Sequence, residues 1–301
     1  MQPLVSVVIP TYNRWPMLCE AIESVLRQSF KDFELIVVDD GSEDGTVGNL
    51  MKCFSNLRVP SQPRRGVAAA RNLGVRCSSG RYLAFLDSDD LWRPKKLEAQ
   101  AGFMMASPQA EICQTEEIWI RHGRRVNPRR KHRKPSGDLF RASLDLCLIS
   151  PSAVMMTREL FDRVGGFDET FAVCEDYDLW LRVTADTPVY LVPEPLVVKR
   201  GGHQDQLSRS TWGLDRFRVM AIRKLLASGL QGEKRMWAIE ALAHKVAILS
   251  QGARKREKES EALNYERLLF EITGEIRYAK REDSRLWERE GVSPKEPGAM
   301  A

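Results

Sequence analysis

The sequence predicts an α/β fold in which a mostly parallel sheet is flanked by helices. Short, β-branched apolar runs alternate with segments whose apolar residues recur at helical spacing. Polar clusters follow the apolar runs, as expected where strands of such a sheet end beside a ligand cleft. From about residue 211 onward, long Ala- and Leu-rich helical stretches take over, and they predict a C-terminal helical appendage.

The first part of the chain repeats a unit of strand and helix. Residues 17–28, for example, place Leu18, Ile22 and Val25 on one helical face. Because crossovers between parallel strands are right-handed, the alternation predicts a doubly wound sheet. The elements expected here are strand 4–9, helix 17–28, strand 33–38, helix 44–54, helix 67–77 and strand 82–86.

The pattern continues less regularly toward the appendage. A helix is expected over 95–105, strands over 112–120 and 152–156, and a helix from Glu175 onward. Three further helices are expected at 212–228, 232–250 and 256–279. The predicted organisation is a catalytic domain at 1–210, a helical appendage at 211–290 and a disordered Pro- and Gly-containing tail at 291–301.

The bulk properties are those of a globular protein. The 301 residues are 43% hydrophobic and 29% charged, with a formal net charge of +5. The six cysteines are scattered without zinc-ligand spacing, which indicates reduced thiols. No signal sequence and no long apolar run stands in the sequence, so we expect a cytoplasmic protein.

An acidic cluster follows the predicted strand 82–86. The side chains of Asp87 and Asp89 are expected to project from the end of this strand on the same side. There they could bind a hard divalent cation together with a diphosphate. The alternative is a turn or a helix N-cap in which the aspartates only stabilise the backbone. A second acidic segment, residues 37–46, could bind a base or ribose, or could simply form a turn.

Five strings in this order resemble a family 2 glycosyltransferase of the GT-A fold: PTYNR, VVDDGSEDGT, GVAAARNLGV, LAFLDSDD and CEDYDLW. The resemblance covers roughly residues 3 to 205. It implies a GT-A-type, Rossmann-like sheet, a nucleotide-diphospho-sugar donor such as a UDP-sugar, and Mn²⁺ or Mg²⁺. It also implies inversion at the anomeric carbon and, by analogy, a place in bacterial surface glycan synthesis.

The resemblance also implies site residues. Asp89 would bind the metal, and His203, downstream of the acidic pair, would be a further ligand. The metal would neutralise charge on the leaving diphosphate. The residues expected to bind the nucleotide-sugar are Pro10, Thr11, Tyr12, Asn13, Arg14, Asp40, Arg71, Asp87 and Ser88.

Asp176 matches the catalytic base of the family. An acceptor hydroxyl has a very high pKa and must lose its proton as it attacks, which a placed carboxylate can assist. Glu175 and Asp178 are the rival carboxylates in the same segment. Glu175, Tyr177 and Trp180 are also acceptor-side candidates, although two aromatic residues at this helical spacing could equally belong to the core.

The basic run at 121–134 could grip an anionic acceptor such as a lipid-linked saccharide, close as a lid, or remain a solvated loop. Its few interleaved aromatic residues argue against nucleic acid as a partner. The appendage could pack on the catalytic domain, form a homodimer interface or contact the membrane peripherally. The last alternative would place the protein at the inner face of the plasma membrane.

Competing functions find less support in the sequence. A nucleotidyltransferase or a dinucleotide oxidoreductase would need a glycine-rich loop after the first strand, and PTYNR contains no glycine. A non-catalytic protein that binds nucleotide-sugars or acts as a scaffold with the same fold remains an alternative. The presence of both Asp89 and Asp176 favours the enzyme.

Overall fold

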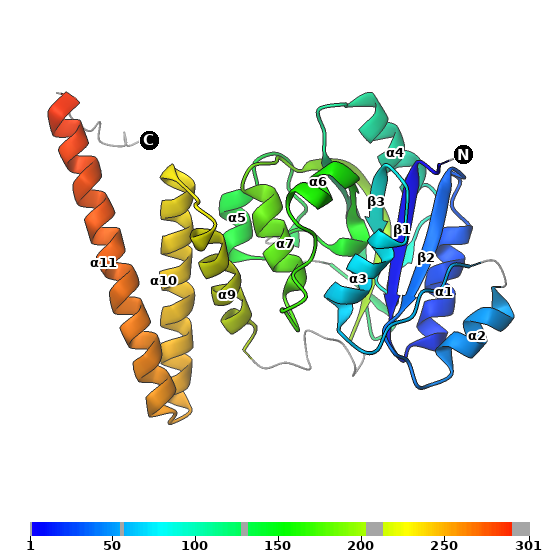
Figure 1. The fold of residues 1–301 in the computed structure, drawn as a ribbon, viewed down its shortest axis with the longest axis horizontal. Coiled ribbons are helices and arrows are strands. Elements are labelled where there is room, and N and C mark those ends of the chain that lie inside the picture. The colour runs from blue at the N-terminus through cyan, green and yellow to red at the C-terminus, as the bar shows by residue number, and fades with distance from the viewer. Residues whose placement is uncertain (1, 55–56, 128–131, 203–212, 291–301) are drawn as a thin grey trace. The chain divides into compact units, whose positions relative to one another are not determined.

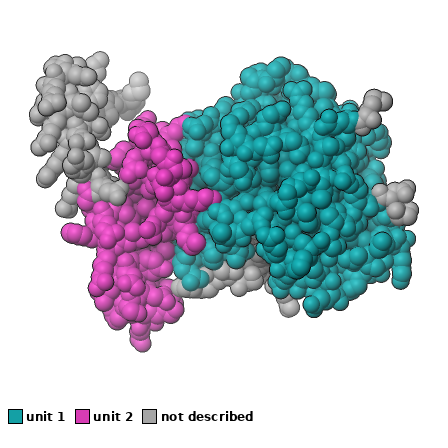
Figure 2. Space-filling model, viewed as in Figure 1, with its two compact units in different colours: residues 1–217 teal, residues 218–301 magenta. Residues whose placement is uncertain are grey.

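The structure, a computed structural model, describes residues 2–54, 57–127, 132–202 and 213–290, with side chains in the last helix described as far as Gly274. The chain divides into two compact units, residues 1–217 and 218–301 (Figure 2). The division falls within a helix, α9 (Leu214–Ala227), because its first residues belong to unit 1 and the rest to unit 2.

One sheet forms the centre of unit 1 (Figure 1). In the described residues it has eight strands. Seven of them follow the order β2-β1-β3-β7-β5-β8-β4, and the eighth, β6, pairs with β5. The strands are β1 (Val5–Thr11), β2 (Phe33–Asp39), β3 (Tyr82–Phe85), β4 (Leu91–Trp92), β5 (Ile112–Arg121), β6 (Arg124–Val126), β7 (Val154–Thr157) and β8 (Tyr190–Gly201).

The N-terminal half of this sheet is parallel, as predicted, and the rest is mixed. Strand β1 pairs in parallel with both β2 and β3, whereas β7 runs antiparallel to β3 and to β5. Strands β5 and β8 are parallel, and β4 joins β8 antiparallel. A GT-A-type sheet is therefore present, with antiparallel strands added beyond the predicted parallel core.

Helices cover both faces of the sheet. Alternate residues of β1 explain this, because Val7 and Ile9 enter the hydrophobic cluster under α1 and α4, whereas Val8 enters the cluster under α3, α6 and α7. The helices are α1 (Trp15–Leu26), α2 (Thr46–Cys53), α3 (Val67–Arg76), α4 (Lys96–Ala106), α5 (Phe140–Asp145), α6 (Arg158–Arg163) and α7 (Glu175–Thr184), with a 3₁₀ turn at Pro151–Ala153.

The close approach of α3 to the sheet depends on Gly74. A β-carbon at Gly74 would lie 2.3 Å from a methyl group of Val8 and 3.1 Å from one of Val38. A larger residue would therefore push α3 away from β1 and β2. This packing matters for the site because α3 carries Arg71.

Unit 2 contains a helical hairpin. Helices α10 (Gly232–Lys255) and α11 (Glu259–Glu290) lie side by side (Figure 1), as the helical pattern of the sequence predicts. Among the described helices, none combines the length and apolar character that crossing a membrane requires.

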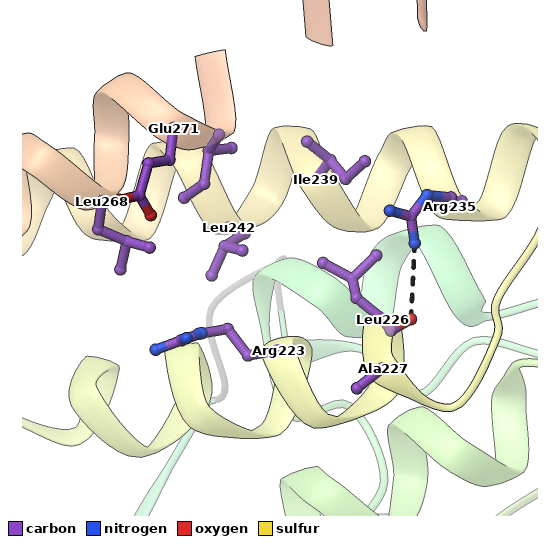
Figure 3. A pocket seen from close by; sticks show the side chains of 9 residues that line it. Arg223, Leu226, Ala227, Arg235, Ile239, Leu242, Leu268 and Glu271 are labelled. Atoms are coloured by element: carbon purple, nitrogen blue, oxygen red, sulfur yellow. Dashed lines mark hydrogen bonds between the residues drawn. The ribbon is translucent and has the colours of Figure 1, made fainter. Parts of the chain in front are cut away.

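A pocket of about 270 Å³ lies within unit 2, among α9, α10 and α11 (Figure 3). Apolar side chains such as Leu226 and Ile239 line it together with Arg223, Arg235 and Glu271, and Arg235 donates a hydrogen bond to the Leu226 carbonyl. None of the residues that line this pocket is a predicted site residue. The predicted site residues all belong to unit 1.

Candidate active site

The acidic cluster lies directly after β3, as its position in the sequence predicts. Carboxylate oxygens of Asp87, Asp89 and Asp90 lie within 4.8 Å of one another. Asp87 and Asp89 are partly exposed, whereas Ser88 and Asp90 are buried. The backbone N–H of Asp87 donates to Ser152 Oγ at 3.2 Å, so the 3₁₀ turn before β7 holds the start of the cluster.

Oxygen donors at this spacing fit a hard divalent cation such as Mn²⁺ or Mg²⁺. Asp89 and Asp87 are the suitable ligands, because they are the partly exposed members of the cluster. The predicted further ligand, His203, lies outside the described residues.

Arg71 links the acidic cluster to the acidic pair on α7. Its two terminal nitrogens lie 2.7 Å from Asp87 Oδ1 and 2.7 Å from Glu175 Oε1. Burial acts against ionisation of Asp87, but Arg71, with Lys199 and Arg14, lowers the pKa of this carboxyl below its ordinary value. Arg71 is itself buried, so its observed role is to join two carboxylates, and its contact with the nucleotide stays a prediction.

Arg14 covers the predicted metal ligand. Arg14 Nη1 lies 2.9 Å from Asp89 Oδ2, and both side chains are about 15% exposed. The pair brings the loop after β1 against the loop after β3, as expected for two strands that end at one edge of the sheet. Arg14 therefore lies where a metal or a diphosphate would bind.

Asp90 has a supporting role. Its carboxylate accepts hydrogen bonds from Ser152 Oγ at 2.7 Å and from the Arg200 backbone N–H at 2.9 Å. Burial and the neighbouring Asp89 and Asp87 raise its pKa to about 8, although Lys199 acts in the opposite direction. The Arg200 side chain also donates to the Asp89 carbonyl. Strand β8 therefore stabilises the acidic cluster through Arg200.

The loops after β1 and β2 interlock. Asn13 donates from its backbone N–H to Ser42 Oγ at 2.9 Å and accepts from the Glu43 N–H at 2.8 Å. The Arg64 guanidinium stacks over the Tyr12 ring at 4.0 Å. Pro10 and Thr11 end β1 as buried residues, so Tyr12, Asn13 and Arg14 form the accessible part of this predicted nucleotide contact.

Asp40 orders the loop that precedes α3. Its carboxylate accepts from Gln62 Nε2 at 2.7 Å and from the backbone N–H groups of Arg65 and Gly66 at 2.9 and 2.8 Å. Asp39 supports its own loop by accepting from the Ser42 N–H. The contact of Asp40 with a base stays a prediction, because Asp40 already holds the loop.

The three acids at the start of α7 differ in their surroundings. Glu175 is buried against Arg71, and burial together with Asp176 raises its pKa to about 7 against the pull of Arg71. Asp178 is buried and forms an ion pair with Arg182 at 2.6 Å. Asp176 is partly exposed. Of the three carboxylates, Asp176 is therefore the one that a substrate can reach.

Hydrogen bonds orient the Asp176 carboxylate. Oδ1 accepts from the Tyr177 N–H at 2.7 Å, and Oδ2 accepts from the Cys147 thiol at 3.5 Å. Burial and Asp176 raise the pKa of Cys147 well above its ordinary value, so the thiol remains a donor at neutral pH. The sequence did not predict a role for Cys147, because it lies 29 residues before Asp176 and only the fold brings the two side chains together.

Tyr177 and Trp180 belong to the core, which corrects the expectation that they line an acceptor pocket. Their side chains are 2% and 1% exposed. The Tyr177 hydroxyl donates to the Leu144 carbonyl at 2.6 Å, and Trp180 packs in the cluster under α7. Neither ring face is available to a sugar.

The basic run contains regular structure at its start and a buried lysine at its end. Strand β6 pairs with β5 as a hairpin, so part of the expected loop is a strand. Lys134 lies 3.0 Å from Glu117, and both side chains are buried. Burial opposes ionisation, but Lys134 and Lys199 lower the pKa of Glu117 to about 2. Residues 128–131 lie outside the described residues.

Sequence reasoning missed β8 and its two cations, Lys199 and Arg200. The apolar run before them is interrupted by prolines at positions 193 and 195, where β8 shifts its register against β5. The one available signal was the Lys-Arg pair directly before Gly201 and Gly202.

Solved structures with the GT-A fold resemble this chain. The TarS 1–349 structure of S. aureus in complex with UDP-GlcNAc aligns with a TM-score of 0.63 at 17% identity, over 98% of this chain and 93% of that one. The mannosyltransferase PcManGT of Pyrobaculum calidifontis, in complex with GDP-Man and Mn²⁺, aligns with a TM-score of 0.57 at 19% identity, over 93% and 88%. At these identities the likeness establishes the fold.

The model of Glycosyl transferase family 2 matches residues 6–165. This match covers more than half of the chain, and the protein therefore belongs to this family.

Curated relatives agree with the family. The E. coli enzyme WfgD, named a UDP-Glc:α-D-GlcNAc-diphosphoundecaprenol β-1,3-glucosyltransferase, is 34% identical over 62% of this chain and 72% of its own length. Uncharacterized glycosyltransferases of Rickettsia felis and Rickettsia typhi are 35% and 32% identical over 62% and 66% of this chain. The chain spans only 31% and 64% of the length of these two relatives.

Proposed function

We propose that this protein is an inverting glycosyltransferase that moves a sugar from a nucleotide-diphospho-sugar to an acceptor hydroxyl. One observation carries the proposal: Arg71 joins Asp87 of the acidic cluster to Glu175, the neighbour of the accessible Asp176. A cluster suited to a metal and a diphosphate is thus joined through one side chain to the residue next to a carboxylate suited to proton abstraction.

Asp176 acts as the catalytic base. As the acceptor oxygen bonds to the anomeric carbon, the bond from that carbon to the diphosphate oxygen breaks and its electron pair stays on the diphosphate. The acceptor proton moves to the Asp176 carboxylate. Displacement in one step inverts the anomeric carbon. The Tyr177 N–H and the Cys147 thiol hold the carboxylate during this transfer.

Asp89 and Asp87 would hold a divalent cation together with the donor diphosphate. Such a cation, when bound, stabilises the negative charge that builds on the leaving group. Tyr12, Asn13 and the loop that Asp40 orders lie around the same edge of the sheet, which supports binding of the nucleoside there.

A UDP-sugar is the proposed donor, and a lipid-linked diphospho-saccharide of bacterial glycan synthesis is the proposed acceptor. Three observations support this choice. WfgD is named for UDP-Glc and a diphosphoundecaprenol acceptor, TuaG of B. subtilis is named for teichuronic acid biosynthesis, and a TarS structure holds UDP-GlcNAc.

A donor screen tests the proposal. The chain is incubated with UDP-, GDP-, ADP-, CDP- and dTDP-sugars and Mn²⁺, and release of the nucleoside diphosphate is measured with and without saccharide acceptors. We expect release from one nucleotide class that Asp89→Ala abolishes and Asp176→Asn lowers by about 10²- to 10⁴-fold. Asp162→Asn, an exposed carboxylate on α6, is the control. Metal-dependent nucleotide binding without turnover would instead identify a non-catalytic binding protein.

A further inference from the structure

Lys199 lies among the carboxylates of the site without being paired to any of them. It belongs to β8, where it is opposite Trp119 of β5 and next to Arg200. Its ammonium donates a hydrogen bond to Ser150 Oγ at 2.8 Å. Within the part of the chain that the structure describes, this is its only hydrogen bond, and no carboxylate forms an ion pair with it.

The neighbouring carboxylates already have other partners. Lys134 and the Trp119 indole N–H hold Glu117, at 3.0 and 2.9 Å. Ser152 and the Arg200 N–H hold Asp90. None of these groups needs Lys199 as a hydrogen-bond donor.

The two carboxylates that the proposed function places beside the substrates also have other partners. Asp87 pairs with Arg71, and Asp176 accepts from Cys147 and Tyr177. Because an ammonium has three N–H groups, Lys199 keeps two donors for an incoming acceptor atom.

The charge around Lys199 keeps it protonated. Burial disfavours the ammonium, but Glu117, Asp90, Asp87 and Asp176 together raise its pKa above the ordinary value. A fixed positive charge thus lies within electrostatic reach of both Asp87 on the donor side and Asp176 on the acceptor side. A phosphate oxygen is the ligand that such an ammonium binds well.

We infer that Lys199 binds the diphosphate of the nucleotide-sugar donor, so that its ammonium shares with the metal the charge that the leaving group acquires. The inference rests on the proposed function. Lys199 stays protonated throughout and takes no part in bond making or bond breaking. Ser150 aims the ammonium, and β8 carries it to the edge of the sheet where Asp90 lies.

Nucleotide binding with Mn²⁺, measured by titration calorimetry, tests this role. The probes are UDP and uridine, and the variants are Lys199→Met and Lys199→Arg, with Lys95→Met as an exposed lysine control. We expect Lys199→Met to weaken UDP binding by about 10- to 100-fold and to leave uridine binding unchanged. Lys95→Met should stay within about threefold of the unaltered chain, because it leaves Lys199 in place. Lys199→Arg keeps a positive charge at this position and should retain more UDP affinity than Lys199→Met.

A milder variant covers the case in which Lys199→Met fails to fold. Ser150→Ala removes the hydrogen bond that aims the ammonium but leaves the charge in place. It should weaken UDP binding by about two- to fivefold without affecting uridine.

Three results would overturn the inference. These are equal UDP affinity of the unaltered chain and a folded Lys199→Met, an equal loss of uridine binding, or a fall in kcat with unchanged UDP affinity, which would place Lys199 with the base. If the unaltered chain binds no nucleoside diphosphate among UDP, GDP, ADP, CDP and dTDP, the proposed function fails as well.

Discussion

The thiol of Cys147 donates a hydrogen bond to Oδ2 of Asp176, with 3.5 Å between sulfur and oxygen. The same thiol also lies 3.4 Å from the Ile149 carbonyl. Residues 147–150 therefore contribute to the site twice, because Ser150 holds Lys199. This segment positions side chains on which the proposed proton transfer and diphosphate binding depend.

Loss of the Cys147 donor should slow turnover. We expect Cys147→Ala to lower kcat by about three- to tenfold with the donor KM unchanged, because a thiol is a weak donor to a carboxylate. Cys147→Ser keeps a hydroxyl donor and should stay near the unaltered rate. Steady-state kinetics of both variants check this, and equal rates for all three proteins would contradict a positioning role.

The thiol of Cys147 should also resist alkylation. Burial and Asp176 raise its pKa, so it stays protonated, and only the thiolate reacts. Iodoacetamide at pH 8 should label the exposed Cys53 and leave Cys147 unmodified, as measured by peptide mass spectrometry. Equal labelling of the two cysteines would show that the thiol ionises readily.

Arg71 should matter strongly for stability. Arg71→Met leaves Asp87 and Glu175 without their shared cation in a largely buried place, and we expect the free energy of unfolding to fall by about 3 to 5 kcal/mol. The matched control is Arg65→Met, which breaks the half-exposed pair with Glu169 and should cost less than about 1 kcal/mol. Urea denaturation followed by circular dichroism measures both.

Arg14 should compete with the metal for Asp89. Arg14→Gln removes the guanidinium that lies 2.9 Å from Asp89 Oδ2, so Mn²⁺ binding without nucleotide should tighten by about three- to tenfold. Arg27→Gln, from the exposed pair with Glu23, is the control and should bind Mn²⁺ unchanged. Calorimetry with Mn²⁺ measures both affinities, and weaker binding to Arg14→Gln would show that Arg14 helps to form the metal site.

Because of Lys96, the free energy of unfolding should change with pH in the neutral to alkaline range. Burial lowers its pKa to about 7 from an ordinary value of 10.5. Between those two values the unfolded chain binds more protons than the folded one, so this lysine makes stability rise with pH across that window. Its contacts are the Val154 carbonyl at 3.1 Å and the Trp92 ring at 3.7 Å.

Lys96→Met should remove this dependence. We expect the variant to be more stable than the unaltered chain by about 1 to 3 kcal/mol at pH 7, with the difference shrinking toward pH 10. Lys95→Met, one residue earlier and exposed, should follow the unaltered chain at each pH. Urea titrations at pH 7, 8.5 and 10 decide the matter, and parallel curves for all three would contradict the lowered pKa.

Local patterns predicted the elements near the start of the chain well. The strands at 4–9 and 33–38 and the helix at 67–77 correspond to β1, β2 and α3, because continuous apolar runs and helical spacing are visible within short windows. The placement of Asp87 and Asp89 after β3 followed for the same reason. Strand β8 escaped notice because two prolines interrupt its pattern.

By itself, the sequence determined the family, the order of the N-terminal strands and the acidic cluster at a strand end, since each depends on neighbouring residues. Only the tertiary structure distinguishes Glu175, Asp176 and Asp178 by their surroundings. It pairs the first with Arg71 and the third with Arg182, both of them buried acids, and leaves the middle acid partly exposed. It likewise brought Lys199 to a cluster more than a hundred residues earlier in the chain, because burial and charge pairing arise from long-range packing.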